Sequence, residues 1–272
     1  MQMGLGRRFN FDSAPAVVFP ARQTNSLAVI RSLGRRGIPV IGLDDVPLSV
    51  GFFSRFCKGV LCPDPRKRER PFLKFIIDLA KTFPAKGVLF LMDDLFVFMA
   101  SRHRAELEPY YHFSYLGLDV MEDCIDKRRM TRLARDLEVP IPQTFLLEDE
   151  DEPIDEIARE VGYPCIIKPT GKFEIKDGKA VGVYRFVAHH GTKALRAASE
   201  AELRRIYDDV RAHGFQVIVQ EELPGDADEL YSLGAYVDAH SRMLRAFTGH
   251  KLRQIPRDFG TCTLAQGAIV PE

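Results

Sequence analysis

The sequence of 272 residues predicts an α/β layer followed by an α+β part. Two observations support this fold class. Between residues 16 and 92, short apolar runs alternate with segments whose apolar residues recur at helical spacing, which is typical of βαβ units in a parallel sheet. Beyond residue 140, two pairs of strand-like segments follow each other directly across turns, which favours antiparallel hairpins.

The first layer is expected to contain four strands with helices between them. The strands are predicted over residues 16–22, 38–44, 58–61 and 87–92. One helix carries Leu27, Ile30 and Leu33 on one face and ends near Gly37 as its C′ residue, and a second covers 72–80. We therefore expect a Rossmann-like layer of about 120 residues.

The dinucleotide-binding fingerprint is missing from this layer. The only Gly-x-Gly motif, Gly4-Leu5-Gly6, precedes the first predicted strand, whereas the fingerprint follows that strand in nucleotide-binding Rossmann folds. This position disfavours a Rossmann oxidoreductase, although that class stays open as a third interpretation until NAD(P) binding is measured.

A further helix is expected to begin after Asp126, which is a suitable N-cap residue. Its apolar residues fall on one face: Met130, Leu133, Ala134 and Leu137. Three cations at 127–129 fill its first turn, where the helix dipole disfavours each of them by about 0.3–1 kcal/mol. A bound anion would compensate for them. Solvation of three long side chains is the simpler alternative.

The second part is predicted to start at Pro140-Ile141-Pro142. The run Glu148–Glu152 is interpreted as a solvated acidic loop. Two hairpins are expected, one over residues 172–187 with its turn at Asp177-Gly178, and one formed by 230–238 and 242–247. Between them, a helix over 200–210 leads into a strand over 216–220.

Two lysines and a strand appear in an order that suggests an ATP site. Lys127 begins the helix described above, and Lys168 ends the short apolar strand Cys165–Ile167. Lys168 could point into a cleft or could mark the place where the strand leaves the core. The later strand Val217–Val219 continues into a polar hinge that could hold a purine. The two lysines and the polar hinge, in this order along the chain, together favour binding of a nucleoside polyphosphate.

Composition limits the other classes of function. The chain is 46% hydrophobic and has 38 basic and 38 acidic side chains, so its formal net charge of zero argues against a general nucleic-acid binder. No apolar run approaches the ~20 residues that span a bilayer. Residues 1–12 lack the apolar region of a secretory signal. The five cysteines form no Cys-x-x-Cys pair, which fits a reduced, cytoplasmic location.

With these motifs in this order, the sequence resembles the ATP-grasp superfamily of carboxylate–amine ligases, which includes carbamoyl-phosphate synthetase, biotin carboxylase and D-aspartate ligase-like proteins. The resemblance covers most of the chain. It implies a Rossmann-like pre-ATP-grasp domain over residues 1–120, the N-terminal subdomain of an ATP-grasp domain over 121–220, and the start of an incomplete C-terminal lobe over 221–272.

The resemblance also implies the roles of the cofactor-binding residues. Two lysines would hold the phosphates of ATP, three hinge residues would receive adenine, and a later glutamate would bind the ribose hydroxyls. These residues are Lys127 and Lys168, then Glu221, Glu222 and Leu223, and finally Glu229. The glycine-rich phosphate loop of the superfamily is replaced by Thr170–Glu174.

The catalytic residues implied by the resemblance are Lys251 and Arg253. They lie in Thr248–Gln254, which resembles a basic strand found in one group of uncharacterised ATP-grasp proteins. Two residues apart on a strand, they are expected to share one face and point toward a cleft. Arg253 is the better candidate for stabilising an acyl phosphate, because its guanidinium binds oxyanions in a bidentate manner. A solvated edge strand protected by charge is the alternative.

The reaction implied is ATP-dependent activation of a carboxylate as an acyl phosphate, followed by attack of an amine. The expected partners are small-molecule carboxylates and amines and a possible second copy of the chain, with no nucleic acid and no membrane. The expected cofactors are ATP and Mg²⁺, with metal ligands beyond Glu272 and none assigned within the chain. The chain alone is therefore predicted to bind nucleotide weakly and to turn over little. A non-catalytic nucleotide-binding relative with a binding or regulatory role, and a piece of a longer ligase, are the alternatives.

Overall fold

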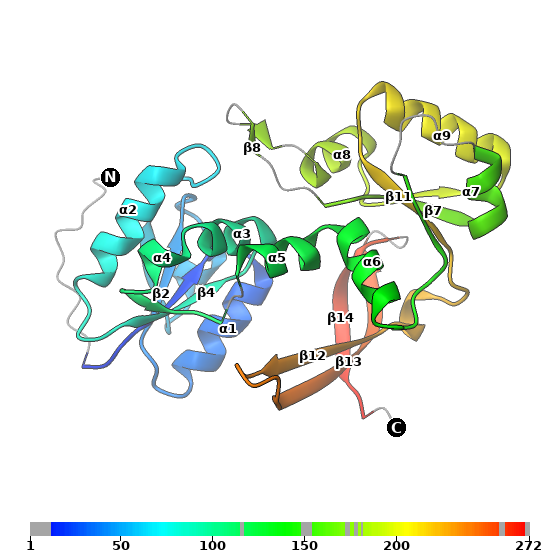
Figure 1. The fold of residues 1–272 in the computed structure, drawn as a ribbon. Coiled ribbons are helices and arrows are strands. Elements are labelled where there is room, and N and C mark those ends of the chain that lie inside the picture. The colour runs from blue at the N-terminus through cyan, green and yellow to red at the C-terminus, as the bar shows by residue number, and fades with distance from the viewer. Residues whose placement is uncertain are drawn as a thin grey trace. The chain divides into compact units, whose positions relative to one another are not determined.

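The computed structural model describes most of the chain as two compact units (Figure 1). The first unit consists of the chain up to Arg129 together with the short hairpin of β8 (Ile175–Lys176) and β9 (Lys179–Ala180). The second unit consists of the remaining residues. The residues described are 12–114, 117–147, 154–171, 175–176, 179–180, 182–255 and 259–269. Among the helices in these ranges, none has the length and apolar character needed to cross a membrane.

The first unit contains a five-stranded sheet in which every strand pair is parallel. The strand order is β3-β2-β1-β4-β5, as in a Rossmann-like layer. The strands are β1 (Ala16–Phe19), β2 (Val40–Asp44), β3 (Lys58–Leu61), β4 (Gly87–Leu91) and β5 (Tyr111–His112). The first four confirm the strands that the sequence predicted, whereas the two-residue β5 was not predicted.

Helices cover both faces of this sheet because successive strand residues point to opposite sides. Val18 packs with Ile30 of α1. The neighbouring Phe19 ring lies 4.7 Å from that of Phe72 in α2 and 4.5 Å from that of Phe96 in α3, measured between ring centroids. The helical elements are α1 (Thr24–Gly34), η1 (Val50–Phe53), α2 (Glu69–Ala80), α3 (Asp94–Arg102), α4 (Arg104–Leu107) and α5 (Leu118–Ile125).

The second unit contains a four-stranded antiparallel sheet in the order β10-β7-β11-β6. Its strands are β6 (Thr144–Leu146), β7 (Cys165–Pro169), β10 (Leu195–Ala197) and β11 (Val217–Glu221). Side chains from one face of β7 and β11 form a single core with those of α7 (Ile154–Val161), α8 (Val183–His190) and α9 (Glu200–Ala212). Figure 1 shows these helices along that side of the sheet.

One predicted hairpin is only partly correct. Its short ladder pairs Ile175–Lys176 with Lys179–Ala180, but the continuation over Val183–Val187 is helical and belongs to α8. Gly182 has a φ of 74°, and Gly191 closes the helix in the left-handed conformation with a φ of 70°. Burial of Phe186 in the core overrides the strand propensity of this segment. The turn Asp177-Gly178 and the acidic run Glu148–Glu152 lie outside the described residues.

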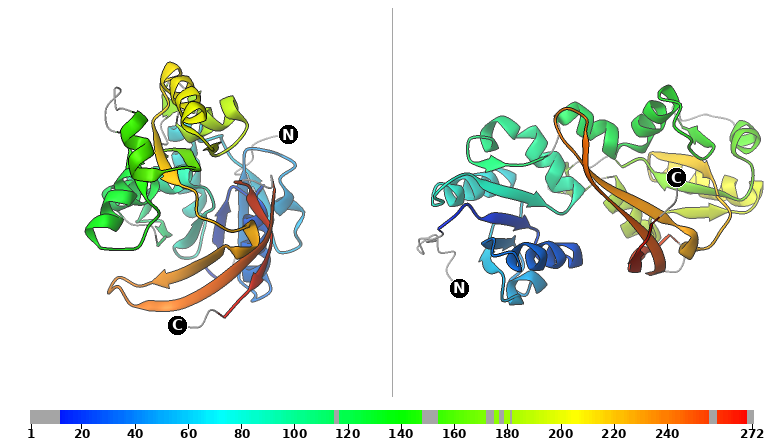
Figure 2. Two further views of the ribbon diagram at one scale, coloured as in Figure 1. Left: turned by 90° about the vertical axis from the view of Figure 1, so that its right-hand side faces the viewer. Right: turned by 90° about the horizontal axis from the view of Figure 1, so that it is seen from below.

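The last described elements form a separate three-stranded antiparallel sheet, β12-β13-β14. Its strands are β12 (Tyr231–Val237), β13 (Met243–Ile255) and β14 (Thr261–Gly267), preceded by the single turn η2 (Ala227–Glu229). The β12–β13 hairpin confirms the second predicted hairpin. Figure 2 shows the sheet as a long, curved and twisted ribbon. Every side chain of β12 and β14 is exposed.

Candidate functional site

Lys168 lies on the face of the second unit's sheet opposite its helices. Cys165 and Ile167 of the same strand point into the core below α7, α8 and α9, so Ile166 and Lys168 point the other way. Burial raises the pKa of the Cys165 thiol to about 11, which makes this cysteine a core residue and not a nucleophile. Cys165 is fully buried.

The Lys168 ammonium is held in place by a relay of hydrogen bonds across three strands. Its Nζ donates to Oε1 of Gln220 on β11 over 2.7 Å. Nε2 of Gln220 in turn donates to Oγ1 of Thr144 on β6 over 2.8 Å, and the Thr144 hydroxyl donates to the main-chain oxygen of Pro142 over 2.8 Å. The relay orients Lys168 on the sheet face.

Sequence reasoning missed Gln220 and Thr144 as parts of the site. The available signal was the position of Gln220, a polar residue directly after the apolar run Val217–Val219. Its link to Lys168 depends on the antiparallel register, which pairs Ile218 with Lys168. Thr144 is completely buried and offered no sequence signal.

Glu221, the first residue of the predicted hinge, is the last residue of β11, and Glu222 and Leu223 follow that strand. The two glutamates are hydrogen-bonded to neighbouring segments. The Glu221 amide donates to the Gln143 carbonyl over 2.9 Å, and its carboxylate accepts from the Gln143 amide over 2.8 Å. The Glu222 amide donates to the Pro164 carbonyl over 3.2 Å, and its carboxylate pairs with Nε of Arg196 at 2.6 Å.

Leu223 differs from the two glutamates before it. Its side chain is 58% exposed, and within the described ranges its amide donates no hydrogen bond. Among the described residues, Leu223 therefore offers a main-chain donor without a partner two residues past the end of β11, a strand that β7 and β6 flank on both sides. This is the property expected of a hinge that pairs with the edge of a heterocyclic base.

Glu229, the predicted ribose ligand, lies in η2 close to the hinge. Its carboxylate lies against Gly225, whose φ of 115° is one that favours glycine. Glu229 is exposed. The following residue, Leu230, accepts a hydrogen bond from the Lys251 amide over 2.9 Å, which ties the η2 segment to β13.

Lys251 and Arg253 both lie in β13, as predicted, but the ladder is irregular between them. The pairing with β14 shifts register between Lys251 and Arg253 and again before Gln254. Because a bulge interrupts the regular alternation of side chains, their spacing of two no longer establishes a shared face. Nζ of Lys251 donates to Oε1 of Gln254 over 2.9 Å, and Arg253 is exposed.

Lys127 belongs to the first unit, at the start of α6 (Lys127–Asp136). Burial lowers the pKa of its ammonium, and the carboxylates of Asp126 and Asp94 partly oppose that shift. Burial conversely raises the pKa of Asp94, with repulsion from Asp93 acting in the same direction and attraction to Lys127 against it. Lys127 is thus a partly buried cation that faces acidic groups of its own unit.

The predicted cap of α6 is confirmed, but the cations of its first turn are compensated within the protein. Oδ1 of Asp126 accepts from the amides of Arg128, at 2.8 Å, and Arg129, at 3.4 Å. The Arg129 guanidinium pairs with Asp123 at 2.6 Å and with Glu122 at 2.8 Å in the last turn of α5. Carboxylates of the preceding helix therefore offset the unfavourable dipole, so these arginines do not require a bound anion.

The hinge carboxylates do not form a magnesium site. Mg²⁺ prefers carboxylates together with substrate phosphates, but the carboxylates of Glu221 and Glu222 already bind Gln143 and Arg196. Within the described ranges, the group of metal-ligating side chains that lies close together is His189, Asp209 and His213, an imidazole-rich set unlike a magnesium site. We therefore assign no residue of this chain to Mg²⁺.

Comparison with known proteins gives one relative and many structural matches. No protein-family model matches the sequence. The chain is 25% identical over 200 residues to a D-aspartate ligase of Enterococcus faecium (strain Aus0004), which covers 70% of this chain and 45% of the relative. Its fold matches an L-amino acid ligase from Bacillus licheniformis with a TM-score of 0.61 and 12% identity, over 97% of this chain and 56% of that protein.

A second structural match is a carboxyaminoimidazole ribonucleotide synthase from Aspergillus clavatus complexed with ATP. The TM-score is 0.59 and the identity 14%, over 89% of this chain and 55% of that one. The chain thus spans about half the length of the proteins it matches. These matches confirm the mixed fold, and together with the ligase relative they confirm the resemblance to the ATP-grasp superfamily that the sequence predicted.

Proposed function

We propose that this chain binds ATP and forms part of a ligase that activates a carboxylate as an acyl phosphate for attack by an amine. The observation that carries the proposal is the relay from Lys168 through Gln220 to Thr144, which holds an ammonium group at Gln220, the residue directly before the hinge. Support comes from the resemblance of the chain to a D-aspartate ligase and from its fold, shared with an ATP complex.

In this proposal the two lysines and the hinge act on different parts of ATP. Lys127 and Lys168 neutralise phosphate oxygens, which is most of what phosphoryl transfer asks of a protein. The amide of Leu223 donates to adenine, while the amides of Glu221 and Glu222 fix the preceding backbone to Gln143 and Pro164. Glu229 accepts hydrogen bonds from the ribose hydroxyls.

We assign Lys251 and Arg253 to the acyl phosphate. Because the bulges interrupt the alternation of side chains along β13, each of the two residues has to be tested by its own substitution. We also retain the proposed division into a pre-ATP-grasp domain (1–120), an ATP-grasp subdomain (121–220) and the start of a further lobe (221–272). Mg²⁺, a cytoplasmic location and a homodimer belong to the same proposal.

The substrate class we propose is an amino acid that supplies the carboxylate. The relatives named as ligases act, by name, on D-aspartate and on L-amino acids. The γ-phosphoryl group would pass to a carboxylate oxygen with release of ADP, and the amine would then displace phosphate from the acyl carbon. The nucleophile is an amine or a similar group.

Trapping with hydroxylamine tests this reaction directly. The chain is incubated with ATP, Mg²⁺, hydroxylamine and single amino acids, and hydroxamate is measured together with ADP. Hydroxylamine attacks the acyl phosphate and displaces phosphate, so a ligase gives equal amounts of hydroxamate and ADP with one class of carboxylate. Because this chain alone is expected to turn over little, both products should form in equal but small amounts. Lys168→Ala should abolish both products. Release of ADP without hydroxamate for every carboxylate would contradict the proposed reaction.

A non-catalytic nucleotide-binding protein is the alternative. The observation that favours it is the engagement of Glu221 and Glu222 with Gln143 and Arg196, which takes these two hinge carboxylates away from a metal ion. This alternative predicts saturable binding of ATP that depends on Lys168 but no ADP or hydroxamate under the same conditions.

A further inference from the structure

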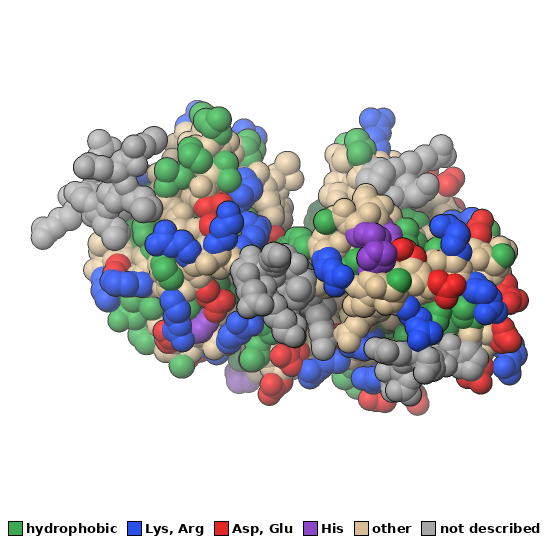
Figure 3. Space-filling view, turned by 90° about the horizontal axis from the view of Figure 1, so that it is seen from above, with side chains coloured by type: hydrophobic (Ala, Val, Ile, Leu, Met, Phe, Trp, Pro, Cys, Tyr) green, Lys and Arg blue, Asp and Glu red, His purple; other side chains and the backbone are tan. Residues whose placement is uncertain are grey.

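Three histidines and one aspartate meet where two helices of the second unit end. His189 and His190 form the last turn of α8, while Asp209 lies in the last turn of α9 and His213 directly follows that helix. Figure 3 shows a compact patch of histidine side chains on the surface of this part of the protein. The cluster lies on the helix side of the sheet and Lys168 on the other.

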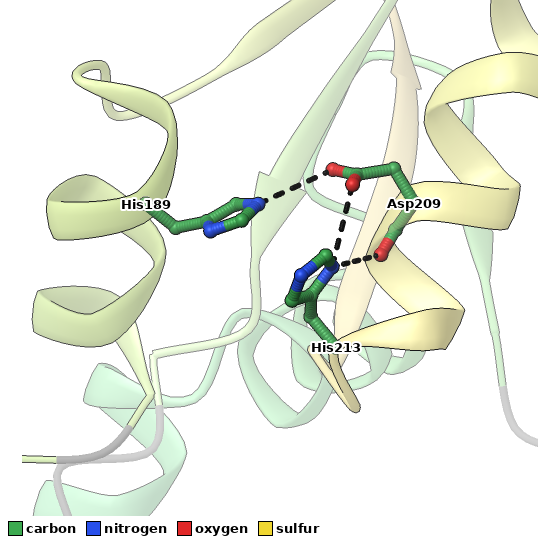
Figure 4. A group of neighbouring side chains, drawn as sticks. All are labelled: His189, Asp209 and His213. Carbon is green, nitrogen blue, oxygen red and sulfur yellow. Dashed lines mark hydrogen bonds and ion pairs between the residues drawn. The ribbon is translucent and has the colours of Figure 1, made fainter.

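The distances within the cluster suit one small cation. Nε2 of His189 lies 3.7 Å from Oδ2 of Asp209. Nδ1 of His213 lies 3.3 Å from Oδ1 of the same carboxylate and 2.8 Å from the main-chain oxygen of Asp209. One ligand atom from each of the three residues can be chosen so that all lie within 4.8 Å of one another. Figure 4 shows the imidazoles of both histidines near the Asp209 carboxylate, with His189 extending from α8 and His213 from the end of α9, the helix that also carries Asp209. Two ligands of a tetrahedral zinc ion, each about 2.1 Å from the metal, are about 3.4 Å apart.

His190 adds an independent observation. Its side chain is only 10% exposed, and its Nε2 lies 3.7 Å from Oδ2 of Asp209. Within the described ranges, this nitrogen is buried without a hydrogen-bond partner. A buried polar atom without a partner is unfavourable, and a metal ion in the cluster would provide one.

The electrostatics of the cluster favour a cation at this position. The C-terminal ends of α8 and α9 both carry the negative end of a helix dipole, and Asp209 adds a full negative charge. Arg185 is the nearby opposing charge: its guanidinium binds the His213 carbonyl at 2.6 Å and packs over the Phe215 ring. Arg185 thus binds the main chain of His213 and not its imidazole, whose Nδ1 faces the main-chain oxygen and the carboxylate of Asp209.

We propose that His189, Asp209 and His213 bind one divalent transition-metal ion of the zinc class, with Nε2 of His190 or a water molecule as the fourth ligand. Imidazole together with a carboxylate is a donor set that suits zinc, and it does not suit magnesium or calcium. Because the ligands come from two helices, the ion would fix the end of α8 to the end of α9. This site is independent of the proposed ATP site.

Titration with metal alone tests the proposal. The full 272-residue chain, freed of metal by a chelator, is titrated with Zn²⁺ by calorimetry and with Co²⁺ by visible absorption, which reports a tetrahedral site. We expect one equivalent of saturable binding and a rise in the thermal unfolding midpoint on addition of Zn²⁺. His189→Ala and His213→Ala, one on each helix, should each weaken binding at least about tenfold.

The matched control is His240→Ala, which removes an exposed histidine from the turn between β12 and β13 and should leave Zn²⁺ binding unchanged. Asp209→Asn keeps the size of the side chain, removes its charge and should weaken binding. The unfolding midpoint of each metal-free variant shows whether it is folded. Absence of saturable binding to the unmodified chain, or full binding by both folded histidine variants, would overturn the proposal.

Discussion

The hydrogen bonds around Lys168 show how single residues can fix the position of a side chain proposed to bind phosphate. Lysine has a flexible chain of four carbons, so a lysine on an open sheet face samples many rotamers and loses that freedom when it binds. Here Gln220 accepts from the ammonium, and Thr144 accepts from Gln220. Since Thr144 is completely buried, the relay is anchored in the rigid part of the sheet.

Removal of Gln220 should therefore weaken nucleotide binding without removing a charge. For Gln220→Ala we expect the affinity for a non-hydrolysable ATP analogue to fall by about tenfold, equivalent to ~1.4 kcal/mol, because Lys168 loses the group that orients it. Calorimetric titration measures the effect. Gln266→Ala, an exposed glutamine in β14, is the control, and an equal loss in both variants would contradict the role given to Gln220.

The lowered pKa of Lys127 predicts a pH dependence of binding. Without nucleotide, the Lys127 ammonium loses its proton as the pH rises through a pKa below the ordinary 10.5, so the positive charge that attracts phosphate disappears in alkaline solution. The affinity for the ATP analogue should fall as the pH is raised toward 10.5, before an ordinary lysine would lose its charge. Lys127→Arg keeps its charge over that range and should show a smaller fall. Identical pH profiles for the two proteins would exclude Lys127 as a phosphate ligand.

The junction of α5 and α6 illustrates control of a helix start by its neighbours. Asp126 is both the C-cap residue of α5 and the N-cap residue of α6. Glu122 and Asp123 in the last turn of α5 form ion pairs with Arg129. Three cations in the first turn of an isolated helix are unfavourable because they face the positive end of the helix dipole. Here the carboxylates at the end of α5 offset that repulsion.

Loss of the cap should destabilise the protein measurably. Asp126→Ala leaves the amides of Arg128 and Arg129 without an acceptor and should cost about 0.5–2 kcal/mol in the free energy of unfolding, measured by urea denaturation. Asp136→Ala is the comparison at the other end of α6, where a carboxylate opposes the dipole. That change should be neutral or slightly stabilising, and equal losses would show that the cap has no special effect.

The two antiparallel sheets of the second unit differ in local burial. In β7 and β11 most side chains are buried, whereas in β12 and β14 all of them are exposed. Local opening is easier where few apolar contacts hold an element. Amides of β12 and β14 should therefore exchange with deuterium at least about tenfold faster than those of β7 and β11 in mass-spectrometric exchange. Equal protection would show that the exposed sheet is stabilised by contacts beyond those described.

At the scale of the whole molecule, the parallel layer was predictable because its strands are short apolar runs between clear helical patterns. Strand β3 was predicted to the residue. Segment Val183–His190 was not, because its valines and aromatic residues fit a strand locally while two glycines and the burial of Phe186 make it a helix. Tertiary contacts of this kind cannot be read from a local pattern.

The candidate site was predictable in part for a similar reason. Lys168 lies on β7, and the hinge begins at the end of the neighbouring strand β11. The order of these two segments along the chain was therefore enough to predict that they belong to one site. The partners of Lys168 depend on an antiparallel register that the sequence does not specify by itself. The histidine cluster carried a usable signal, a His189-His190 pair and an Asp209–His213 spacing of four on a helix, but its two halves meet only through packing of α8 against α9.

Nucleotide-dependent stabilisation tests the central claim most directly. The unfolding free energy of the 272-residue chain is measured with and without a non-hydrolysable ATP analogue, beside Lys168→Ala and the control Lys67→Ala, an exposed lysine of the first unit. At about 100 times its dissociation constant the analogue should add ~2.7 kcal/mol to the parent chain and to Lys67→Ala, and nothing to Lys168→Ala. The same gain in Lys168→Ala, or no gain in the parent chain, would contradict an ATP site at Lys168.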